Sequence, residues 1–189
     1  MKEILAKLVE GKDLTKEEAM KAQELILTGQ ATEAQIACFL TALRMKGETL
    51  DEITGLAAVL RNKANTISPK VEDYVDFVGT GGDCTYSFNI STTSAFVIAA
   101  AGIPVAKHGN RSVSSKSGAA DILEKLGVNL MLETDRAEEV LEETDMAFLF
   151  AQKYHSAMKN VGPVRKEMGE RTIFNILGPL TNPANASRQ

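Results

Sequence analysis

The chain has 189 residues, of which 44% are hydrophobic and 24% charged, a composition typical of a globular protein that buries a core. Its 25 acidic and 21 basic side chains give a net charge of −4, which excludes bulk attraction to the phosphate backbone of a nucleic acid. Cys38 and Cys84 are too few for a disulfide framework or a cysteine zinc site, so a reducing compartment is expected.

The chain shows no feature of a membrane or secreted protein. Its first ten residues alternate charged with apolar side chains and lack the uninterrupted apolar core of a signal peptide. The longest apolar stretch, Ala95 to Ala106, is shorter than the ~18 residues that a membrane span needs. We therefore expect a cytoplasmic protein with no membrane partner.

The first 65 residues are predicted to be helical. Three helix starts carry a threonine followed three positions later by Glu or Gln, the pattern of a capping box, and they lie at Thr15, Thr32 and Thr49. Gly29 and Gly47 follow the apolar runs of the first two helices, where a left-handed residue commonly ends a helix. This pattern predicts a small helical bundle.

From Val71 onward the pattern changes to alternating strands and helices. The expected strands are Tyr74–Val78, Val105–Lys107 and Met146–Phe150. The expected helices are 90–101, 119–126, 135–143 and one opened by Gly162-Pro163. Such alternation predicts a parallel sheet. The polar, proline-containing run 181–189 normally leads into another element, so the sheet is expected to be incomplete.

A glycine-rich loop, Gly79-Thr-Gly-Gly-Asp83, follows the first predicted strand. It would lie at the carboxyl end of a parallel strand, where open α/β sheets bind ligands, and its glycines would let backbone amides approach an anion. Cys84 stands where a dinucleotide fingerprint needs a glycine, and the Gly-Lys-Ser/Thr of a P-loop is absent. Taken alone, the loop fits a structural turn as well as a phosphate site.

Hydroxyl and amide side chains gather where the next helix begins. They are Ser87, Asn89, Ser91, Thr92, Thr93 and Ser94. Beside the positive end of a helix dipole, such a cluster suits a phosphate or a hydrated metal ion. The structural alternative is an over-supplied N-cap, since one of these residues would suffice. We favour the anion site.

A second donor-rich segment, Lys107 to Ser115, follows the next predicted strand and therefore falls at the same edge of the sheet. It combines the cations Lys107 and Arg111 with a glycine and further donors, as a multiply charged ligand requires. A solvated basic turn is the alternative. That alternative would not explain why two donor-rich loops converge on one edge, so a binding site is predicted.

Four ordered motifs together resemble the anthranilate phosphoribosyltransferase family. They are Gly79-Thr-Gly-Gly-Asp83, Asn89-Ile-Ser-Thr92, Lys107-His-Gly-Asn-Arg111 and Gly169-Glu-Arg-Thr-Ile-Phe-Asn-Ile-Leu-Gly-Pro-Leu-Thr-Asn-Pro183. The resemblance spans nearly the whole chain. It implies a helical domain of residues 1–70, with a contribution from about 160–185, and an α/β domain of residues 71–189 with a mostly parallel sheet that is truncated at the C-terminus.

The resemblance also implies an activity and its site. The family transfers the phosphoribosyl group of phosphoribosyl pyrophosphate to the amine of anthranilate in tryptophan biosynthesis. Contacts with phosphoribosyl pyrophosphate are implied for Gly79, Gly82, Asp83, Ser87, Asn89, Ile90, Ser91, Thr92, Lys107, His108, Gly109, Asn110, Arg111, Ser112, Val113, Ser114, Ser115 and Ala119. Anthranilate contacts are implied for Gly79, Asn110 and Arg165, and Mg²⁺ binding for Ser91. A homodimer through the helical domain is implied as well.

The transfer chemistry favours positioning and charge neutralisation over a strong base, because positive charge builds on the ribose as pyrophosphate leaves. We therefore assign no catalytic residue; His108 is a candidate base because the unperturbed pKa of histidine suits proton transfer near neutrality, but a packing or orienting role is at least as good an explanation. Arg165 could be a solvated helix residue. The family's acidic metal-binding Asp-Glu pair would lie beyond Gln189, so residues 1–189 alone are expected to show low or no activity.

Two other functions compete with this one. A pyrimidine nucleoside phosphorylase-like enzyme would share the fold, but Gly109-Asn110 replaces the serine expected there after Lys107-His108. A non-catalytic nucleic-acid-binding protein of the same fold is opposed by the net charge of −4 and by the presence of Asn110 and Arg165.

Overall fold

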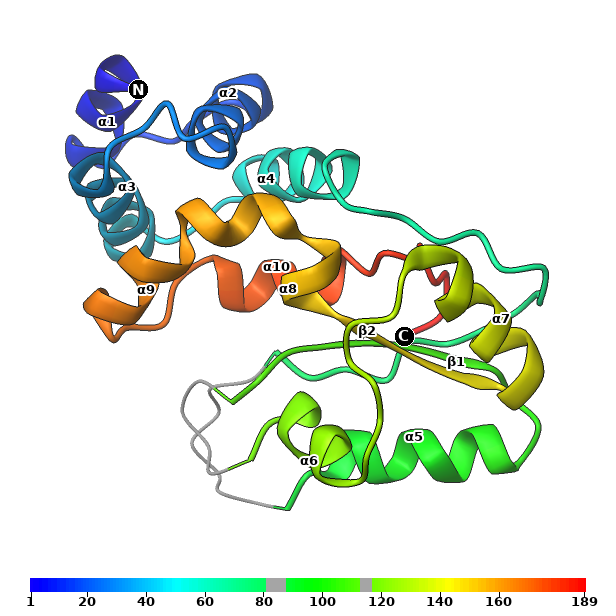
Figure 1. The fold of residues 1–189 in the computed structure, drawn as a ribbon. Coiled ribbons are helices and arrows are strands. Elements are labelled where there is room, and N and C mark those ends of the chain that lie inside the picture. Colours follow the sequence, from blue (N-terminus) through cyan, green and yellow to red (C-terminus); the bar gives the residue numbers. More distant parts are fainter. Residues whose placement is uncertain (81–87, 113–116) are drawn as a thin grey trace. The chain divides into compact units, whose positions relative to one another are not determined.

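The computed structural model describes residues 1–80, 88–112 and 117–189 (Figure 1). The chain divides into two compact units. The helical unit comprises Met1–Ala64 and His155–Leu180, and the α/β unit comprises Asn65–Tyr154 and Thr181–Gln189. In the described part of the chain, every helix is too short or too polar to span a membrane.

The helical unit is built from two separate stretches of chain. Its first stretch forms α1 (Lys2–Val9), α2 (Lys16–Leu27), α3 (Glu33–Lys46) and α4 (Leu50–Asn62). Its second stretch forms η1 (Ser156–Asn160), α9 (Gly162–Met168) and α10 (Phe174–Leu180). The predicted helix start at Gly162-Pro163 is confirmed, with Pro163 in the first turn where its missing N–H costs no hydrogen bond.

All three predicted capping boxes are present. The Thr15 hydroxyl accepts the Glu18 N–H at 3.2 Å, and the Glu18 carboxylate accepts the Thr15 N–H at 3.0 Å. The same reciprocal pairing starts α3 at Thr32 and α4 at Thr49. Gly29 and Gly47 have positive φ angles of +73° and +88°, which favour glycine, and so confirm the predicted helix ends.

The core of the helical unit draws on both stretches. Phe39, Leu43 and Leu56 from the first stretch are fully buried, and Ile173 and Leu177 from the second stretch belong to the same cluster. Truncating one such leucine to alanine typically costs about 2–5 kcal/mol. The second stretch is therefore an integral part of the bundle and not an appendage.

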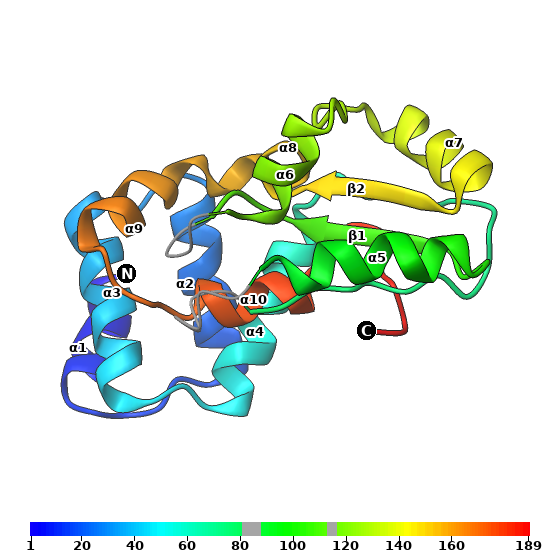
Figure 2. The same ribbon diagram turned by 90° about the horizontal axis from the view of Figure 1, so that it is seen from below.

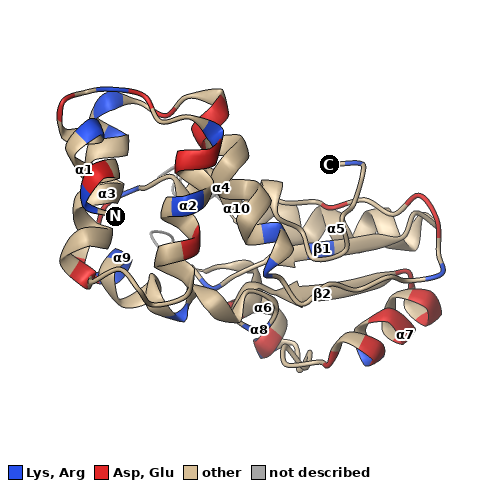
Figure 3. Ribbon diagram, turned by 90° about the horizontal axis from the view of Figure 1, so that it is seen from above, with Lys and Arg blue, Asp and Glu red and all other residues tan. Residues whose placement is uncertain are grey.

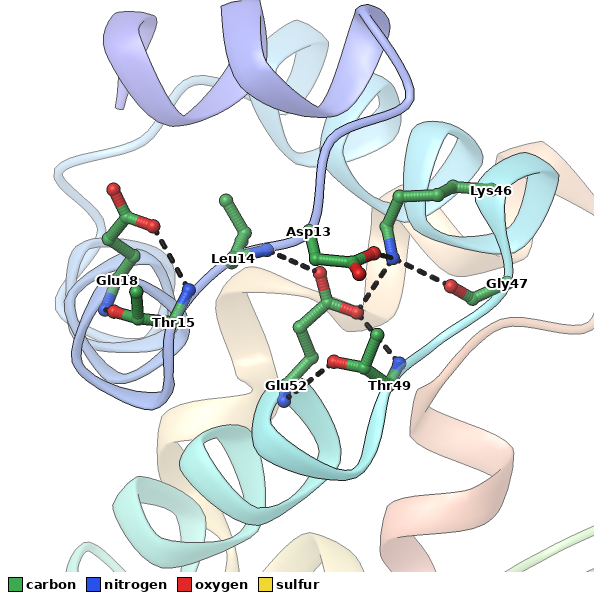
Figure 4. Close-up of polar contacts among 8 residues, drawn as sticks. All are labelled: Asp13, Leu14, Thr15, Glu18, Lys46, Gly47, Thr49 and Glu52. Atoms are coloured by element: carbon green, nitrogen blue, oxygen red, sulfur yellow. Dashed lines mark hydrogen bonds and ion pairs between the residues drawn. The ribbon is translucent and has the colours of Figure 1, made fainter.

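An ion-pair cluster, the Lys46 cluster, in which Lys46 and Glu52 are buried and Asp13 is exposed, joins the α1–α2 loop to the start of α4 (Figure 4). The Lys46 ammonium lies 2.8 Å from Asp13 Oδ1 and 3.0 Å from Glu52 Oε2. Glu52 also accepts the backbone N–H groups of Leu14 at 2.9 Å and Thr49 at 2.8 Å. Every charge in this cluster therefore has an opposite charge or a donor beside it.

The α/β unit contains a parallel pair of strands, β1 (Val105–Gly109) and β2 (Met146–Phe150). Its helices are α5 (Ile90–Ala100), α6 (Ala119–Lys125), α7 (Thr134–Thr144) and α8 (Ala151–Tyr154). The register places Val105 opposite Met146 and Gly109 opposite Phe150. Figure 2 shows α5 beside β1 and α7 beside β2, so the strands are sandwiched between helices. The predicted parallel α/β arrangement is confirmed.

The predicted strand Tyr74–Val78 is wrong. Only Val75 pairs within this segment, through isolated parallel bridges to Val105 and Arg188. The backbone groups of β1 that would continue the pairing are hydrogen-bonded to side chains instead: the His108 N–H donates to Asp76 Oδ1, and the Ala106 carbonyl accepts from Asn182. The apolar pattern alone does not reveal this competition.

Candidate functional site

The glycine loop begins beside the N-terminus of α5. A Cβ atom built on Gly79 would lie 3.9 Å from the Ser91 hydroxyl oxygen, so the two predicted binding segments meet at this point. The predicted site residues Gly82, Asp83 and Ser87 lie outside the described residues, as do Val113, Ser114 and Ser115.

The N-terminus of α5 is capped by one residue. Asn89 Oδ1 accepts the Thr92 N–H at 3.1 Å, and the Thr93 hydroxyl donates to the Asn89 carbonyl at 3.0 Å. The Thr92 side chain is buried, and its hydroxyl makes no hydrogen bond with a described residue. The N-cap explanation therefore accounts for Asn89 but not for Ser91 or Thr92. Ile90 is exposed at this end of the helix.

Lys107 points into the α/β unit. Its side chain is only 2% exposed, and its ammonium donates to the Phe77 carbonyl. Burial lowers the pKa of Lys107 to about 8, although the negative charge of Asp76 opposes this shift. The cation that the sequence assigns to the binding site is thus held at the base of the glycine loop.

The adjacent His108 is also buried, with 4% of its surface exposed. Its backbone N–H donates to Asp76 Oδ1 at 3.1 Å. Burial raises the pKa of Asp76, while hydrogen bonds from the Asn182 side chain and the His108 backbone and the charge of Lys107 act in the opposite direction. His108 therefore lies on a buried polar cluster and not on an open surface.

The end of β1 requires a glycine. A Cβ atom on Gly109 would lie 2.7 Å from the Phe148 ring, closer than packing allows, and 3.3 Å from Ala119 Cβ, which is a tight contact. The next residue, Asn110, is exposed, and its Oδ1 accepts the Arg111 N–H at 2.8 Å. Close packing at Gly109 thus fixes where the donor-rich segment leaves the strand.

Arg111 is bound to acidic residues of α6. Its guanidinium makes two hydrogen bonds of 2.8 Å with Glu124 and one of 3.2 Å with Asp121, and it lies 5.7 Å from the centre of the Phe150 ring. Asp121 also accepts the N–H groups of Ser112 at 3.0 Å and Gly118 at 2.9 Å. Both hydrogen bonding and charge hold the pKa of Arg111 above its ordinary value. A phosphate ligand would therefore compete with two carboxylates.

Arg165 belongs to the helical unit, on α9. It donates to Asn175 Oδ1 at 3.2 Å and lies 5.6 Å from the centre of the Phe174 ring. Burial lowers its pKa, and its Nε is buried without a hydrogen-bond partner among the described residues. Arg165 is thus oriented by its neighbours, in contrast to a freely solvated helix residue.

Three residues of the α/β unit were missed in the sequence. Asp76 and Asp121 hold backbone groups of the predicted segment 107–115, and Asn182 holds the carbonyl of Ala106 directly before it. Asp76 was detectable as a single charge within the apolar run Tyr74-Val-Asp-Phe-Val78, and Asp121 as an acid in the first turn of a predicted helix. Asn182 lies within the fourth motif, but the motif does not indicate its partner Ala106, which is 76 positions away.

The comparison with protein families assigns the chain as a whole. The α/β domain of the glycosyl transferase family matches residues 71–189, and the helical bundle domain of that family matches residues 2–64. The chain belongs to this glycosyl transferase family. The predicted helical-plus-α/β fold is confirmed by both matches.

Relatives with high similarity to this chain include anthranilate phosphoribosyltransferases. Anthranilate phosphoribosyltransferase of Acetivibrio thermocellus is 57% identical over all of this chain and 55% of its own length. The protein of that name from Methanobrevibacter smithii is 54% identical over all of this chain and 56% of its own length. The resemblance predicted from the four motifs is confirmed. The chain spans about half the length of the curated relatives it matches.

Solved structures of anthranilate phosphoribosyltransferases also resemble the fold of this chain. Anthranilate phosphoribosyltransferase from Thermus thermophilus matches with a TM-score of 0.90 at 44% identity, over 97% of this chain and 56% of that chain. The Saccharomyces cerevisiae protein, in complex with PRPP and Mg, matches with a TM-score of 0.87 at 27% identity, over 97% of this chain and 55% of that chain.

Proposed function

We propose that residues 1–189 carry the phosphoribosyl pyrophosphate-binding loops of an anthranilate phosphoribosyltransferase. The observation that carries the proposal is the 57% identity, over all 189 residues, to a relative of that name. The adjacency of Gly79 and Ser91 supports it, because a glycine beside a helix N-terminus suits an anion. The phosphate groups would be bound there and by the segment after β1.

For anthranilate, we propose contacts with Gly79, Asn110 and Arg165. The orientation of Arg165 by Asn175 and its unused Nε support a hydrogen bond to a carboxylate, which a guanidinium forms strongly. In the transfer, the bond between ribose C1 and pyrophosphate breaks, pyrophosphate leaves with the electron pair, the amine nitrogen forms the new bond to C1, and the nitrogen releases one proton to solvent. Because the ribose becomes cationic, the contribution of these residues is to bind and align the reactants.

Magnesium is proposed because the Saccharomyces cerevisiae relative was solved with PRPP and Mg. Within residues 1–80, 88–112 and 117–189, no three His, Cys, Asp or Glu side chains converge to form a metal site. Ser91 would offer a single neutral oxygen, whereas Mg²⁺ in proteins usually takes one or two carboxylates and substrate phosphates. The described residues therefore do not by themselves fit a magnesium centre.

The binding proposal is tested by titrating the 189-residue chain with phosphoribosyl pyrophosphate and Mg²⁺ in a calorimeter. We expect saturable binding, with little or no loss of anthranilate fluorescence when anthranilate is added. Phosphorolysis of a nucleoside without binding of phosphoribosyl pyrophosphate would contradict the proposal. Robust turnover of anthranilate would contradict the expected low activity.

The role of Arg165 is tested separately. Arg165→Lys keeps the positive charge but loses the planar fork that matches a carboxylate, so anthranilate binding should weaken by roughly tenfold. Lys166→Gln, on the exposed side of the same helix, is the control and should leave binding unchanged. Equal binding by the Arg165→Lys chain and the unaltered chain would exclude the proposed contact.

We further propose a homodimer through the helical unit. Val9, Met45 and Leu50 are 70%, 84% and 79% exposed, which provides apolar surface for a second copy. Light scattering of the eluting peak in gel filtration should give twice the chain mass of 20.4 kDa. A nucleic-acid partner is not proposed, because Figure 3 shows basic residues interspersed with acidic ones, which are abundant along α7.

A further inference from the structure

The pairing between the Val75 segment and β1 stops abruptly. The Val75 N–H donates to the Pro104 carbonyl at 2.9 Å, and the Ala106 N–H donates to the Val75 carbonyl at 3.0 Å. In a parallel ladder this pattern repeats every second residue. The next rung would therefore join Phe77 to the carbonyl of Ala106 and the N–H of His108.

Three side chains take hydrogen bonds of that missing rung. The Asn182 amide donates to the Ala106 carbonyl at 2.8 Å, and Asp76 Oδ1 accepts the His108 N–H at 3.1 Å. The third is Lys107, whose ammonium donates to the Phe77 carbonyl. The Ala106 carbonyl, the His108 N–H and the Phe77 carbonyl are thus each hydrogen-bonded to a side chain and not to the opposite backbone.

These three side chains are almost completely removed from solvent. Asp76, Lys107 and Asn182 are 1%, 2% and 5% exposed. Burying charged groups is costly, so a cluster of this kind is unfavourable unless its members satisfy one another and the backbone. A simple strand pairing would satisfy the same backbone groups without burying a charge. Stability alone therefore does not explain why the strand ends in this cluster.

The consequence of ending the strand here is the position of Gly79. Released from β1 after Asp76, the chain reaches the N-terminus of α5, where a Cβ on Gly79 would lie 3.9 Å from the Ser91 hydroxyl. One more pair of backbone hydrogen bonds would hold Phe77 beside β1. The turn into the glycine loop would then begin further along the chain.

We propose that Asp76 and Asn182 are positioning residues of the phosphate site. By replacing one rung of the ladder with side-chain hydrogen bonds, they fix where the chain leaves β1 and hence where Gly79 lies beside α5. Neither residue needs to touch the ligand. The inference rests on the proposed function for the identity of the ligand, but the effect on the backbone does not depend on that identity.

The test uses four variants of the 189-residue chain. Asp76→Ala and Asn182→Ala remove the hydrogen bonds. Asp76→Asn keeps an oxygen for the His108 N–H and is the conservative rescue. Asp73→Asn is the matched control, since Asp73 lies on the same segment but has a side chain that is 67% exposed. Urea unfolding of each variant identifies any chain that is not folded under the binding conditions.

Binding of phosphoribosyl pyrophosphate with Mg²⁺ is measured by calorimetry. We expect Asp76→Ala and Asn182→Ala to weaken it by roughly tenfold or more, as for the loss of a buried hydrogen bond. Asp76→Asn should recover part of the loss, and Asp73→Asn should show none. Unchanged affinity in folded Asp76→Ala and Asn182→Ala chains would overturn the proposal.

Amide NMR spectra test the same inference without the ligand. The Gly79 and Thr80 signals should shift in the Asp76→Ala and Asn182→Ala chains and stay in place in the Asp73→Asn chain. If the unaltered chain fails to bind phosphoribosyl pyrophosphate, the proposed function fails, and these shifts alone decide the inference. If Asp76→Ala does not fold, Asn182→Ala decides the inference, and coincidence of its Gly79 and Thr80 signals with those of the Asp73→Asn chain would overturn it.

Discussion

The two units treat a buried lysine in opposite ways. In the helical unit, Lys46 has a side chain that is 7% exposed and contacts two carboxylates. Burial alone would lower its pKa, but hydrogen bonds to Asp13 and Glu52 outweigh that effect and raise it. In the α/β unit, burial lowers the pKa of Lys107 to about 8, and the charge of Asp76 offsets this effect only in part.

Lys46 is thus part of a structural ion pair, whereas Lys107 carries a charge that is buried at an energetic cost. The Lys46 cluster satisfies its charges and joins a loop to two helices, which needs no further explanation than stability (Figure 4). Lys107 remains buried without a contacting carboxylate, at the base of a glycine loop. Strongly perturbed groups of this kind concentrate at functional sites. The comparison therefore points to Lys107 as a lysine near a functional site and to Lys46 as a structural one.

The largest effect is expected from breaking the Lys46 cluster. Lys46→Met leaves Glu52 buried without its cation, and such losses typically cost about 3–5 kcal/mol. Urea unfolding followed by the amides of the helical unit would measure it. Lys12→Met, in a pair whose side chains are 64% and 60% exposed, is the control. A loss below about 1 kcal/mol would mean that the cluster is not a structural ion pair.

The pH dependence should distinguish the two lysines. Because the folded pKa of Lys107 is about 8 and its ordinary value 10.5, the unfolded chain binds more protons between these pH values, so stability rises with pH there. At about 1.4 kcal/mol per pKa unit, the full rise is roughly 3 kcal/mol. The pKa of Lys46 is raised, so its contribution is complete below pH 10.5 and is lost only above its folded pKa.

Lys107→Met isolates this contribution. Urea unfolding of the unaltered chain and of this variant is compared from pH 7.5 to 10.5, with Lys46→Met as the second reference. The difference between the unaltered chain and Lys107→Met should rise with pH. A flat difference would show that Lys107 is not destabilised by burial.

A smaller loss of stability is expected when a helix N-cap is removed in either unit. Thr32→Ala and Asn89→Ala each remove a side chain that accepts a backbone N–H, and each should cost about 1 kcal/mol of unfolding free energy. Only Asn89→Ala should also weaken binding of phosphoribosyl pyrophosphate, as measured by calorimetry. Equal effects on binding would contradict the assignment of the binding site to the α/β unit.

The smallest effects are expected at exposed ion pairs. Glu170→Gln in the helical unit removes a pair with Arg44 in which the side chains are 63% and 49% exposed. Glu124→Gln in the α/β unit removes a contact with Arg111. Each should leave the urea unfolding midpoint nearly unchanged, because solvent screens exposed ion pairs. A clearly larger loss for Glu124→Gln would show that Arg111 organises the segment after β1.

Local features of the fold were predictable because their causes lie within a few residues. The capping boxes at Thr15, Thr32 and Thr49 each involve a residue three positions away, and all three formed. The strand Met146–Phe150 was also predicted with its observed bounds, since it is a short apolar run that follows a charged segment. The predicted strand Tyr74–Val78 is also a short apolar run, but it does not form. Side chains of Lys107 in β1 and of the distant Asn182 take hydrogen bonds that its pairing with β1 would use.

The sequence by itself determined the helix starts, the alternation of strands and helices, and the motifs that resemble one family. These depend on periodicity and on contacts between near neighbours. Only the tertiary structure decided that Arg111 faces two carboxylates and that Asp76 and Asn182 end a strand. These outcomes depend on which buried polar groups meet after folding, and a hydrogen bond between residues 76 positions apart leaves no local pattern.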